Sequence, residues 1–429
     1  MLYSDRPIST PRQDVLGRSG FALELARAID NLDLSTDGFV MGLLGDWGAG
    51  KTSVIELIAR YLRHIEMSRA SESLVLNDAS PQRRSLEDLE AMSEVYERIE
   101  PRIVAMGALN QNLTYWEKIN RKQEFTRWLG SASDAEIADR YFELKLKVEA
   151  APRNIVIRFS PWLIAGKAEL TQALLSELAR GLEEKLGDEV AASFGKVLKR
   201  LSEFAPVVGS GLDLLTSTPV GKVASAFGTW TGGVAGAMIS GPTLDDAREQ
   251  LRASLRSRAN QKVVVIIDDL DRLTPAEALE MVSLVKSLGD LPNVLYFLSY
   301  SEAQLVELIS SALSLDGRSY LEKIVQYPKH LPPVDDADLS NLLDADLEVL
   351  FRGITDEEAS RLTGSWHSVF RHYLSTPRHV RRFVNSLSVA LAALSDHADR
   401  VDLALMTVLE LYEPSVYAWL RRNIDMVVS

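Results

Sequence analysis

The sequence predicts an α/β fold in which a mainly parallel β-sheet is covered by helices on both faces. Three observations predict it. Short apolar runs suited to buried strands recur along the chain, helical segments lie between them, and glycine or aspartate follows directly where two of the runs end. Alternating strands and helices build a parallel sheet, because each helix returns the chain to the edge where the next strand starts.

Five segments are predicted strands, because each is a short run dominated by apolar or β-branched residues. They span residues 39–44, 154–159, 262–267, 293–299 and 323–331. The third is the clearest, with three valines and two isoleucines in six residues. The last is predicted to be an edge strand, because Pro328 has no N–H to give to a neighbouring strand.

Two helices are predicted near the N-terminus from apolar residues spaced three and four apart, over residues 21–32 and 52–65. A capping box with proline at the first helical position predicts another helix start at Thr274. Residues 355–374 and 378–395 are predicted to belong to a C-terminal helical region, and no strong strand is predicted after about residue 340.

The composition excludes several classes of protein. With 47 basic and 60 acidic residues the net charge is −13, which argues against electrostatic binding of nucleic acid or anionic lipid over a broad surface. Cysteine is absent, so disulfide frameworks, cysteine-ligated zinc, iron–sulfur centres and thiol catalysis are excluded. Residues 1–14 contain no apolar run and do not form a secretory signal. We therefore expect a cytoplasmic protein.

A glycine-rich turn after the first strand fits the pattern G-x-x-x-x-G-K-[ST]. We call residues 45–53 the phosphate loop; they are Gly45, Asp46, Trp47, Gly48, Ala49, Gly50, Lys51, Thr52 and Ser53. The glycines let backbone N–H groups turn inward around phosphate oxygens, and the following helix adds its positive end. Lys51 is predicted to reach the β- and γ-phosphates, and Thr52 to ligate Mg²⁺.

The third strand ends in a run of aspartates, in the crevice where ligands of open α/β sheets bind. Asp268 is predicted to hold Mg²⁺, and Asp269 to orient or deprotonate an attacking water. The alternative for Asp269 is structural, as a cap or an arginine partner. Asp271 and Arg272 are candidates for a local ion pair, and Arg272 is also a candidate to reach a nucleotide across a subunit interface.

Two other sets of side chains have a simpler interpretation than catalysis. The first is His367, His372 and His379, which we interpret as part of a solvated or phosphate-facing basic surface, because no carboxylate is interleaved at metal-ligand spacing. The second is four tryptophans, for which packing is the simplest role. They are Trp162, Trp230, Trp366 and Trp419.

Several motifs together resemble the KAP family of P-loop NTPases, which is related to the STAND and AAA+ groups. GDWGAGKTS resembles its Walker A motif, and VVVIIDDLDR closely resembles its Walker B motif. Phe159-Ser160-Pro161-Trp162 is similar to a strand end that the family writes FNPW, with serine replacing asparagine. KIVQYPKHLPP resembles the strand and turn that follow, and the helix around Arg378 resembles the family's PRxxKRFxN segment.

The resemblance implies a five-stranded P-loop sheet of order 5-1-4-3-2 with helical insertions and a C-terminal helical lid. It implies ATP and Mg²⁺ as ligands, in a pocket capped near Gly17 and Arg18. By position, Ser299 resembles the sensor at the end of the fourth strand and Arg378 the sensor arginine of the lid. Ser301 stands where the family often has aspartate, which departs from the sensor pattern.

On this interpretation the chain divides into six parts. They are an N-terminal nucleotide-binding segment (1–65), a helical insertion (66–150), a second core strand and helix (151–199), a small-residue-rich insertion (200–250), the Walker B and sensor part (251–335) and the lid (336–429).

The stretch 200–241 has three interpretations. Residues 223–240 carry no charge but are mostly small, so a membrane span is the least favoured. Gly228, Gly232, Gly236 and Ser240 recur at a spacing of four, which suits close helix packing at an oligomer or partner interface. A glycine-rich loop, or a helical hairpin on its own domain, is the plainest interpretation.

The function predicted is an ATPase whose hydrolysis switches a conformation or an assembly, and the resemblance extends this to bacterial anti-phage defence. The alternative is an ATP-gated scaffold with little turnover, which forms an oligomer and recruits an effector protein. A small-molecule kinase is disfavoured because the acidic strand end indicates water activation. A nucleic-acid motor is disfavoured by the charge of −13.

Overall fold

In a computed structural model of the chain, residues 6–72, 84–109, 132–163, 167–186, 244–258, 260–313, 316–394 and 398–423 are described, with isolated positions between 190 and 195. Five strands form one sheet. They are β1 (Phe39–Leu44), β2 (Asn154–Phe159), β3 (Lys262–Ile267), β4 (Val294–Tyr300) and β5 (Tyr327–His330).

All neighbouring strands pair in parallel, in the order β2-β3-β4-β1-β5. Read from the other edge this is 5-1-4-3-2, so the expected α/β fold is confirmed. The register places Leu44 beside both Tyr300 and His330, and Ile267 beside Leu298. Four strands therefore end close together, at one edge of the sheet.

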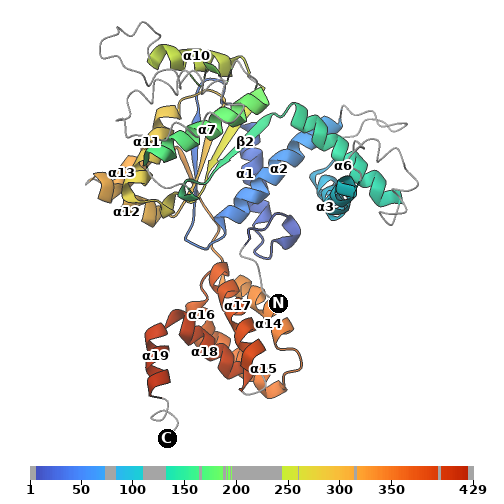
Figure 1. The fold of residues 1–429 in the computed structure, drawn as a ribbon, viewed down its shortest axis with the longest axis vertical. Helices are drawn as coiled ribbons and strands as arrows, with labels where there is room; N and C mark the ends of the chain where they lie inside the picture. The colour runs from blue at the N-terminus through green and yellow to red at the C-terminus, as the bar shows by residue number, and fades with distance from the viewer. Residues whose placement is uncertain are drawn as a thin grey trace.

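Each face of the sheet has its own hydrophobic core, because successive side chains of a strand point to opposite faces. In β3, Val263, Val265 and Ile267 join one core, and Val264 and Ile266 join the other. The first core is closed by α7 (Lys167–Leu186), α10 (Leu244–Arg256), α11 (Pro275–Leu288), α12 (Glu302–Leu313) and α13 (Gly317–Glu322). The second is closed by α1 (Ser19–Asn31) and α2 (Lys51–Ser71), which lie on the other side of the sheet (Figure 1).

A helical pair packs beside α2, formed by α3 (Leu86–Leu109) and α6 (Ala132–Ala150). It has a separate apolar core and a buried polar network. In that network Arg60 of α2 donates to Glu90, Ser93 and Glu97 of α3. His64 lies 3.1 Å from the Tyr141 hydroxyl and 3.3 Å from a Glu90 oxygen. The network ties the helix that follows the phosphate loop to the pair.

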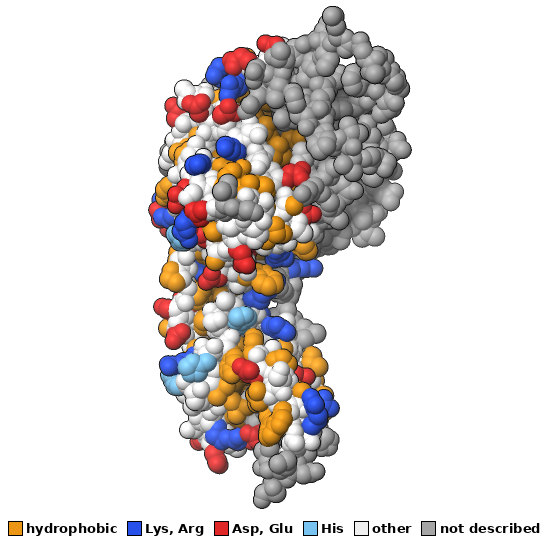
Figure 2. All heavy atoms as spheres, turned by 90° about the vertical axis from the view of Figure 1, so that its left-hand side faces the viewer, with side chains coloured by type: hydrophobic (Ala, Val, Ile, Leu, Met, Phe, Trp, Pro, Cys, Tyr) orange, Lys and Arg blue, Asp and Glu red, His pale blue; other side chains and the backbone are white. Residues whose placement is uncertain are grey.

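The C-terminal part is a helical unit with its own hydrophobic core, in the lower half of Figure 1. It contains α14 (Asp336–Leu350), α15 (Asp356–Ser365), a π-helical turn (Trp366–Phe370), α16 (Arg371–Tyr373), α17 (Pro377–Leu394), α18 (Arg400–Tyr412) and α19 (Pro414–Arg422). No strand follows β5 in the part of this unit that the structure describes, as expected. A narrower waist joins it to the sheet-containing part (Figure 2).

Three element boundaries differ from the prediction for identifiable reasons. The fifth strand is shorter, because the N–H groups of Ile324 and Val325 both donate to Leu321 O and keep that stretch in a turn. The fourth starts one residue later, since Asn293 has a left-handed φ of 60°. The helix expected over 52–65 continues to Ser71, where it packs against the helical pair.

The predicted start at Thr274 is confirmed: its hydroxyl accepts from Glu277 N–H, and Glu277 accepts from Thr274 N–H. The whole stretch 200–241, Trp230 included, lies outside the described residues. Among the residues that are described, no helix is long and apolar enough to cross a membrane.

Candidate functional site

The phosphate loop connects β1 to α2 through two glycines with positive φ, 79° at Gly48 and 94° at Gly50. Such values suit glycine because a side chain would strain the backbone. The loop is fixed at its start by Gly45 N–H, which donates to Tyr300 O of β4. Since α2 begins at Lys51, the loop presents the positive end of a 21-residue helix to the edge of the sheet.

Lys51 lies inside the loop and is 6% exposed. Its Nζ donates to Gly45 O at 2.8 Å and to Asp46 O at 3.3 Å, and it lies 3.9 Å from Asp271 Oδ2. The Lys51 ammonium group is therefore hydrogen-bonded to carbonyl oxygens of the phosphate loop, and it lies where phosphate oxygens are expected to bind.

Thr52 and Asp268 are 216 residues apart in sequence, and the structure brings them into direct contact. The Thr52 hydroxyl donates to Asp268 Oδ2 at 2.9 Å, and the other carboxylate oxygen accepts from Asp269 N–H at 2.9 Å. The donor set fits Mg²⁺, which binds through one or two protein oxygens and takes its remaining ligands from phosphates and water. No group of three or more metal-ligating side chains occurs among the described residues.

Asp269 adopts a left-handed conformation with φ 61°, and a 3₁₀ turn over Leu270–Arg272 follows it. Burial, and after it the negative charge of Asp268, raises the pKa of Asp269; the Arg272 cation opposes both. Arg272 Nε lies 3.2 Å from Asp269 Oδ1. The local partner of Arg272 is therefore Asp269 and not Asp271, because the tight turn brings residues three apart together.

Asp271 was not among the predicted site residues. Its side chain is 2% exposed and turns inward toward Lys51, and its Oδ1 has no hydrogen-bond partner in the described part of the chain. The signal that points to it in sequence is a third carboxylate within four residues of a strand end. The direction of the Asp271 side chain cannot be predicted from the sequence, because it depends on the 3₁₀ turn.

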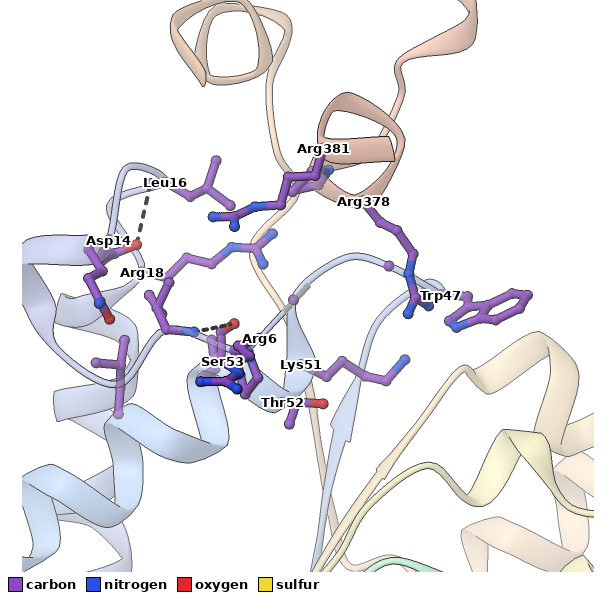
Figure 3. A pocket seen from close by; sticks show the side chains of 18 of the residues that line it. Arg6, Asp14, Leu16, Arg18, Trp47, Lys51, Thr52, Ser53, Arg378 and Arg381 are labelled. Atoms are coloured by element: carbon purple, nitrogen blue, oxygen red, sulfur yellow. Dashed lines mark hydrogen bonds between the residues drawn. The ribbon is translucent and has the colours of Figure 1, made fainter. Parts of the chain in front are cut away.

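A cavity of about 290 Å³ opens between the phosphate loop and the helical unit. The N-terminal segment lines one side, held to the loop by Ile8 N–H, which donates to Ser53 Oγ at 3.3 Å. Figure 3 shows Arg378 and Arg381 reaching toward it from α17, opposite Lys51 and Thr52. Asp269 and Arg272 close the side formed by the sheet. The cavity therefore collects residues from segments that are far apart in the sequence.

Gly17 and Arg18 stand at the start of α1. Gly17 has a left-handed φ of 65°, and the buried Arg18 guanidinium donates to Ala49 O of the phosphate loop and to Pro332 O at 3.0 Å. Burial lowers the pKa of Arg18, although Asp14 and Asp338 favour the cation. Arg18 thus lines the cavity while bracing the loop against the segment that leads to the helical unit.

Ser299 is fully buried in β4, paired in register with Leu43. Its hydroxyl has no hydrogen-bond partner among the described residues, and it does not line the cavity. The structure thus places it beside the strand that leads to the phosphate loop. Its sensor role stays a prediction.

The packing role expected for two tryptophans is wrong. Trp162 is 47% exposed and Trp419 is 52% exposed, whereas Trp366 is half-buried against the core of the helical unit. Trp162 instead borders the cavity, where the Arg272 guanidinium lies 5.0 Å from its ring centre.

The histidines do not assemble into a site in the structure. His367 and His372 are exposed. His379 Nδ1 lies 3.2 Å from Ser375 Oγ, and the ring packs against Tyr412.

Residues 18–394 match the family model described as KAP family P-loop domain. The chain is 27% identical over 294 residues to the phage T7 exclusion protein of Escherichia coli strain K12, an alignment that covers 64% of this chain and 39% of that relative. It therefore spans well under half the length of the curated relative it matches.

Among solved structures, the chain is similar to the Aeropyrum pernix ORC2 protein in its ADP form, with a TM-score of 0.37 and 13% identity, covering 95% of this chain and 71% of that one. The ADPNP–ADP complexes of the same protein match with the same score and identity, covering 95% and 70%.

Proposed function

The chain belongs to the KAP family of P-loop domains, and from that premise we propose that it binds ATP with Mg²⁺ and hydrolyses the β–γ phosphoanhydride bond to switch its conformation or assembly. The observation that carries the proposal is the 2.9 Å hydrogen bond between Thr52 and Asp268. It joins the phosphate loop to the acidic strand end, as phosphoryl transfer requires.

The charge of the cavity supports a polyphosphate ligand. Although the whole chain carries −13, six cationic side chains line this cavity against two carboxylates. The cations are Arg6, Arg18, Lys51, Arg272, Arg378 and Arg381, and the carboxylates are Asp14 and Asp269. A local positive potential in a low-dielectric cleft favours binding of an anion and stabilises charge that develops during the reaction.

Apolar side chains also line the cavity and suit a nucleobase. Ile8, Val15 and Leu16 from the N-terminal segment and Leu57 from α2 line it, and Leu342 approaches from α14. Flat apolar walls with a few polar groups are typical of small-molecule sites. We propose that the base lies here and the triphosphate extends toward Thr52.

In the proposed reaction, Asp269 accepts a proton from water, whose oxygen forms a bond to the γ-phosphorus. The bond from that phosphorus to the bridging oxygen breaks, and the electron pair leaves on ADP. Lys51, Arg378 and the loop N–H groups stabilise the charge on the transferred group. Bound Mg²⁺, held by Thr52 and Asp268, supplies charge neutralisation at the phosphates.

The switch would act between the sheet and the helical unit, because the cavity lies where they meet. A defence role against phage is part of the proposal, supported by the relative that is named for phage T7 exclusion. Expression of the full chain in a phage-sensitive host, compared with Asp269→Asn, tests it: we expect plaque formation to fall with the wild type only.

A second function is favoured by one observation. The cavity is lined both by the phosphate loop and by Arg378 and Arg381 of the helical unit, so bound ATP would join the two parts without being hydrolysed, as an ATP-gated scaffold requires. Such a scaffold would form a homo-oligomer or recruit an effector protein.

Phosphate release together with ATP affinity separates the two functions. We expect Asp269→Asn to bind ATP as tightly as the wild type while phosphate release falls at least about a hundredfold, because removing a general base costs about 10² to 10⁴ in rate. Asp33→Asn, an exposed aspartate outside the cavity, is the matched control. If the wild type and Asp269→Asn both bind ATP and release phosphate at the same rate, the ATPase function is refuted and the scaffold function remains.

A further inference from the structure

Four side chains from four separate segments form a continuous stack at the edge of the cavity. The Arg378 guanidinium of α17 lies 5.4 Å from the ring centre of Trp47 in the phosphate loop. Arg272 lies 5.9 Å from the same indole and 5.0 Å from that of Trp162, in the 3₁₀ turn after β2. Figure 3 shows the Arg378 side chain reaching from α17 to Trp47. Arginine alternates with tryptophan throughout.

Arg272 is the central cation of this stack. Two indoles approach its guanidinium, and its Nε lies 3.2 Å from Asp269 Oδ1. Arginine stacks on aromatic rings through its planar, weakly hydrated guanidinium, and each such contact orients the group as well as attracting it. The two tryptophans therefore set where Arg272 presents its N–H groups.

The exposure of the indoles needs an explanation that packing does not supply. Trp47 is 57% exposed and Trp162 is 47% exposed. Both border the same cavity. A large aromatic side chain left in water at the mouth of a charged cavity is well placed to hold a cation, because the ring face is free for it.

From this geometry we propose that Trp162 is a positioning residue, which acts with Trp47 to fix the Arg272 guanidinium beside Asp269. The proposal deepens the proposed function and rests on it, since it takes Asp269 as the group that handles the attacking water. Trp162 itself touches neither the water nor the phosphates; it acts through Arg272.

The proposal makes a specific kinetic claim. Trp162→Ala frees the guanidinium to rotate, so we expect kcat to fall about tenfold, the middle of the range for one cation–π contact. The ATP Kd should change by less than about threefold, because Lys51 and the loop N–H groups remain. Trp162→Phe keeps an aromatic face and should restore at least half of kcat. Trp419→Ala removes an equally exposed tryptophan outside the cavity and should leave kcat unchanged.

A double-mutant cycle tests whether Trp162 acts through Arg272. In an Arg272→Ala background, Trp162→Ala should lower kcat no further, since the group that it positions is gone. A further tenfold loss in that background would overturn the proposal. So would a Trp162→Phe variant as slow as Trp162→Ala.

Fluorine NMR of full-length protein labelled with 5-fluorotryptophan tests the stack without turnover. The Trp162 resonance, assigned by its loss in Trp162→Phe, should shift in Arg272→Ala while the Trp419 resonance stays. A wild-type chain with no turnover would overturn the proposed function and this catalytic consequence together. An unmoved Trp162 resonance with normal turnover would overturn the stack alone.

Discussion

Lys51 illustrates how a single residue is prepared for its ligand. Without phosphate its ammonium group is held by two loop carbonyls and lies near Asp271, so a buried charge is not left unpaired. A polyphosphate would replace these contacts with stronger ones, because both partners would then be charged.

For Lys51→Ala we expect at least a tenfold loss of ATP affinity and no detectable hydrolysis, since the charge-assisted contacts to the phosphates vanish. Titration calorimetry and phosphate release measure the two effects. Lys185→Ala, at the end of α7 and paired with Glu184, is the control and should behave as wild type. Unchanged affinity in Lys51→Ala would show that the loop does not bind phosphate.

Gly48 sets how closely the helical unit can approach the loop. A Cβ at this position would lie 2.9 Å from Arg378 Cβ, and its φ of 79° is strained for any other residue. We expect Gly48→Ala to displace Arg378 and lower kcat at least about tenfold, because charge stabilisation at the reacting group depends on position within ångströms.

The control for Gly48→Ala is Gly20→Ala. Gly20 lies in α1, its φ is ordinary, and nothing lies within 4 Å of its added Cβ. Steady-state kinetics and thermal melting should show no loss in that variant. A Gly48→Ala enzyme with wild-type kcat would show that close contact between Arg378 and the loop is dispensable.

At the scale of elements, the helix that follows the phosphate loop is also the anchor of the α3–α6 pair. Arg60 and His64 lie outside the apolar face expected of α2, and both contact Glu90 in the polar network. Burial lowers the pKa of His64, so the ring is neutral at pH 7 and the network does not depend on its charge. The pair and the loop therefore share one rigid helix.

For Glu90→Ala we expect the free energy of unfolding to fall by about 2 kcal/mol, because a nearly buried Arg60 loses one of its carboxylate partners. Urea unfolding measures the change. Glu87→Ala on the exposed side of the same helix should change it by less than about 0.5 kcal/mol. Equal losses in the two variants would indicate a helix-wide effect instead of the network.

At the scale of the whole molecule, the proposed site belongs to neither half. The sheet contributes the loop and the aspartates, and the helical unit contributes Arg378 and Arg381. Five arginines and Lys51 line one cavity and repel each other, so binding of an anion between them favours a closer approach of the two halves.

We therefore expect ATP with Mg²⁺ to lower the radius of gyration of Asp269→Asn, measured by small-angle X-ray scattering, while light scattering reports the mass. A lower radius at constant mass indicates closure of the helical unit on the sheet. A rise in mass instead indicates the assembly switch, and no change in either would contradict a nucleotide-driven switch. Lys51→Ala is the control that should not respond.

The sequence by itself determined the strands, the sheet's direction and the phosphate loop. Those features depend on local patterns: apolar runs, a glycine spacing and a capping box, each of which acts over a few residues. The strand order was predicted through the resemblance. The six-part division of the chain stays a prediction.

Only the tertiary structure decided which charges meet. It paired Arg272 with Asp269, turned Asp271 toward Lys51, and placed Trp162 on Arg272 instead of in a core. These contacts depend on a left-handed residue, a 3₁₀ turn and segments more than a hundred residues apart. A periodic pattern carries no information about them, because side-chain direction at a strand end is set by what packs there.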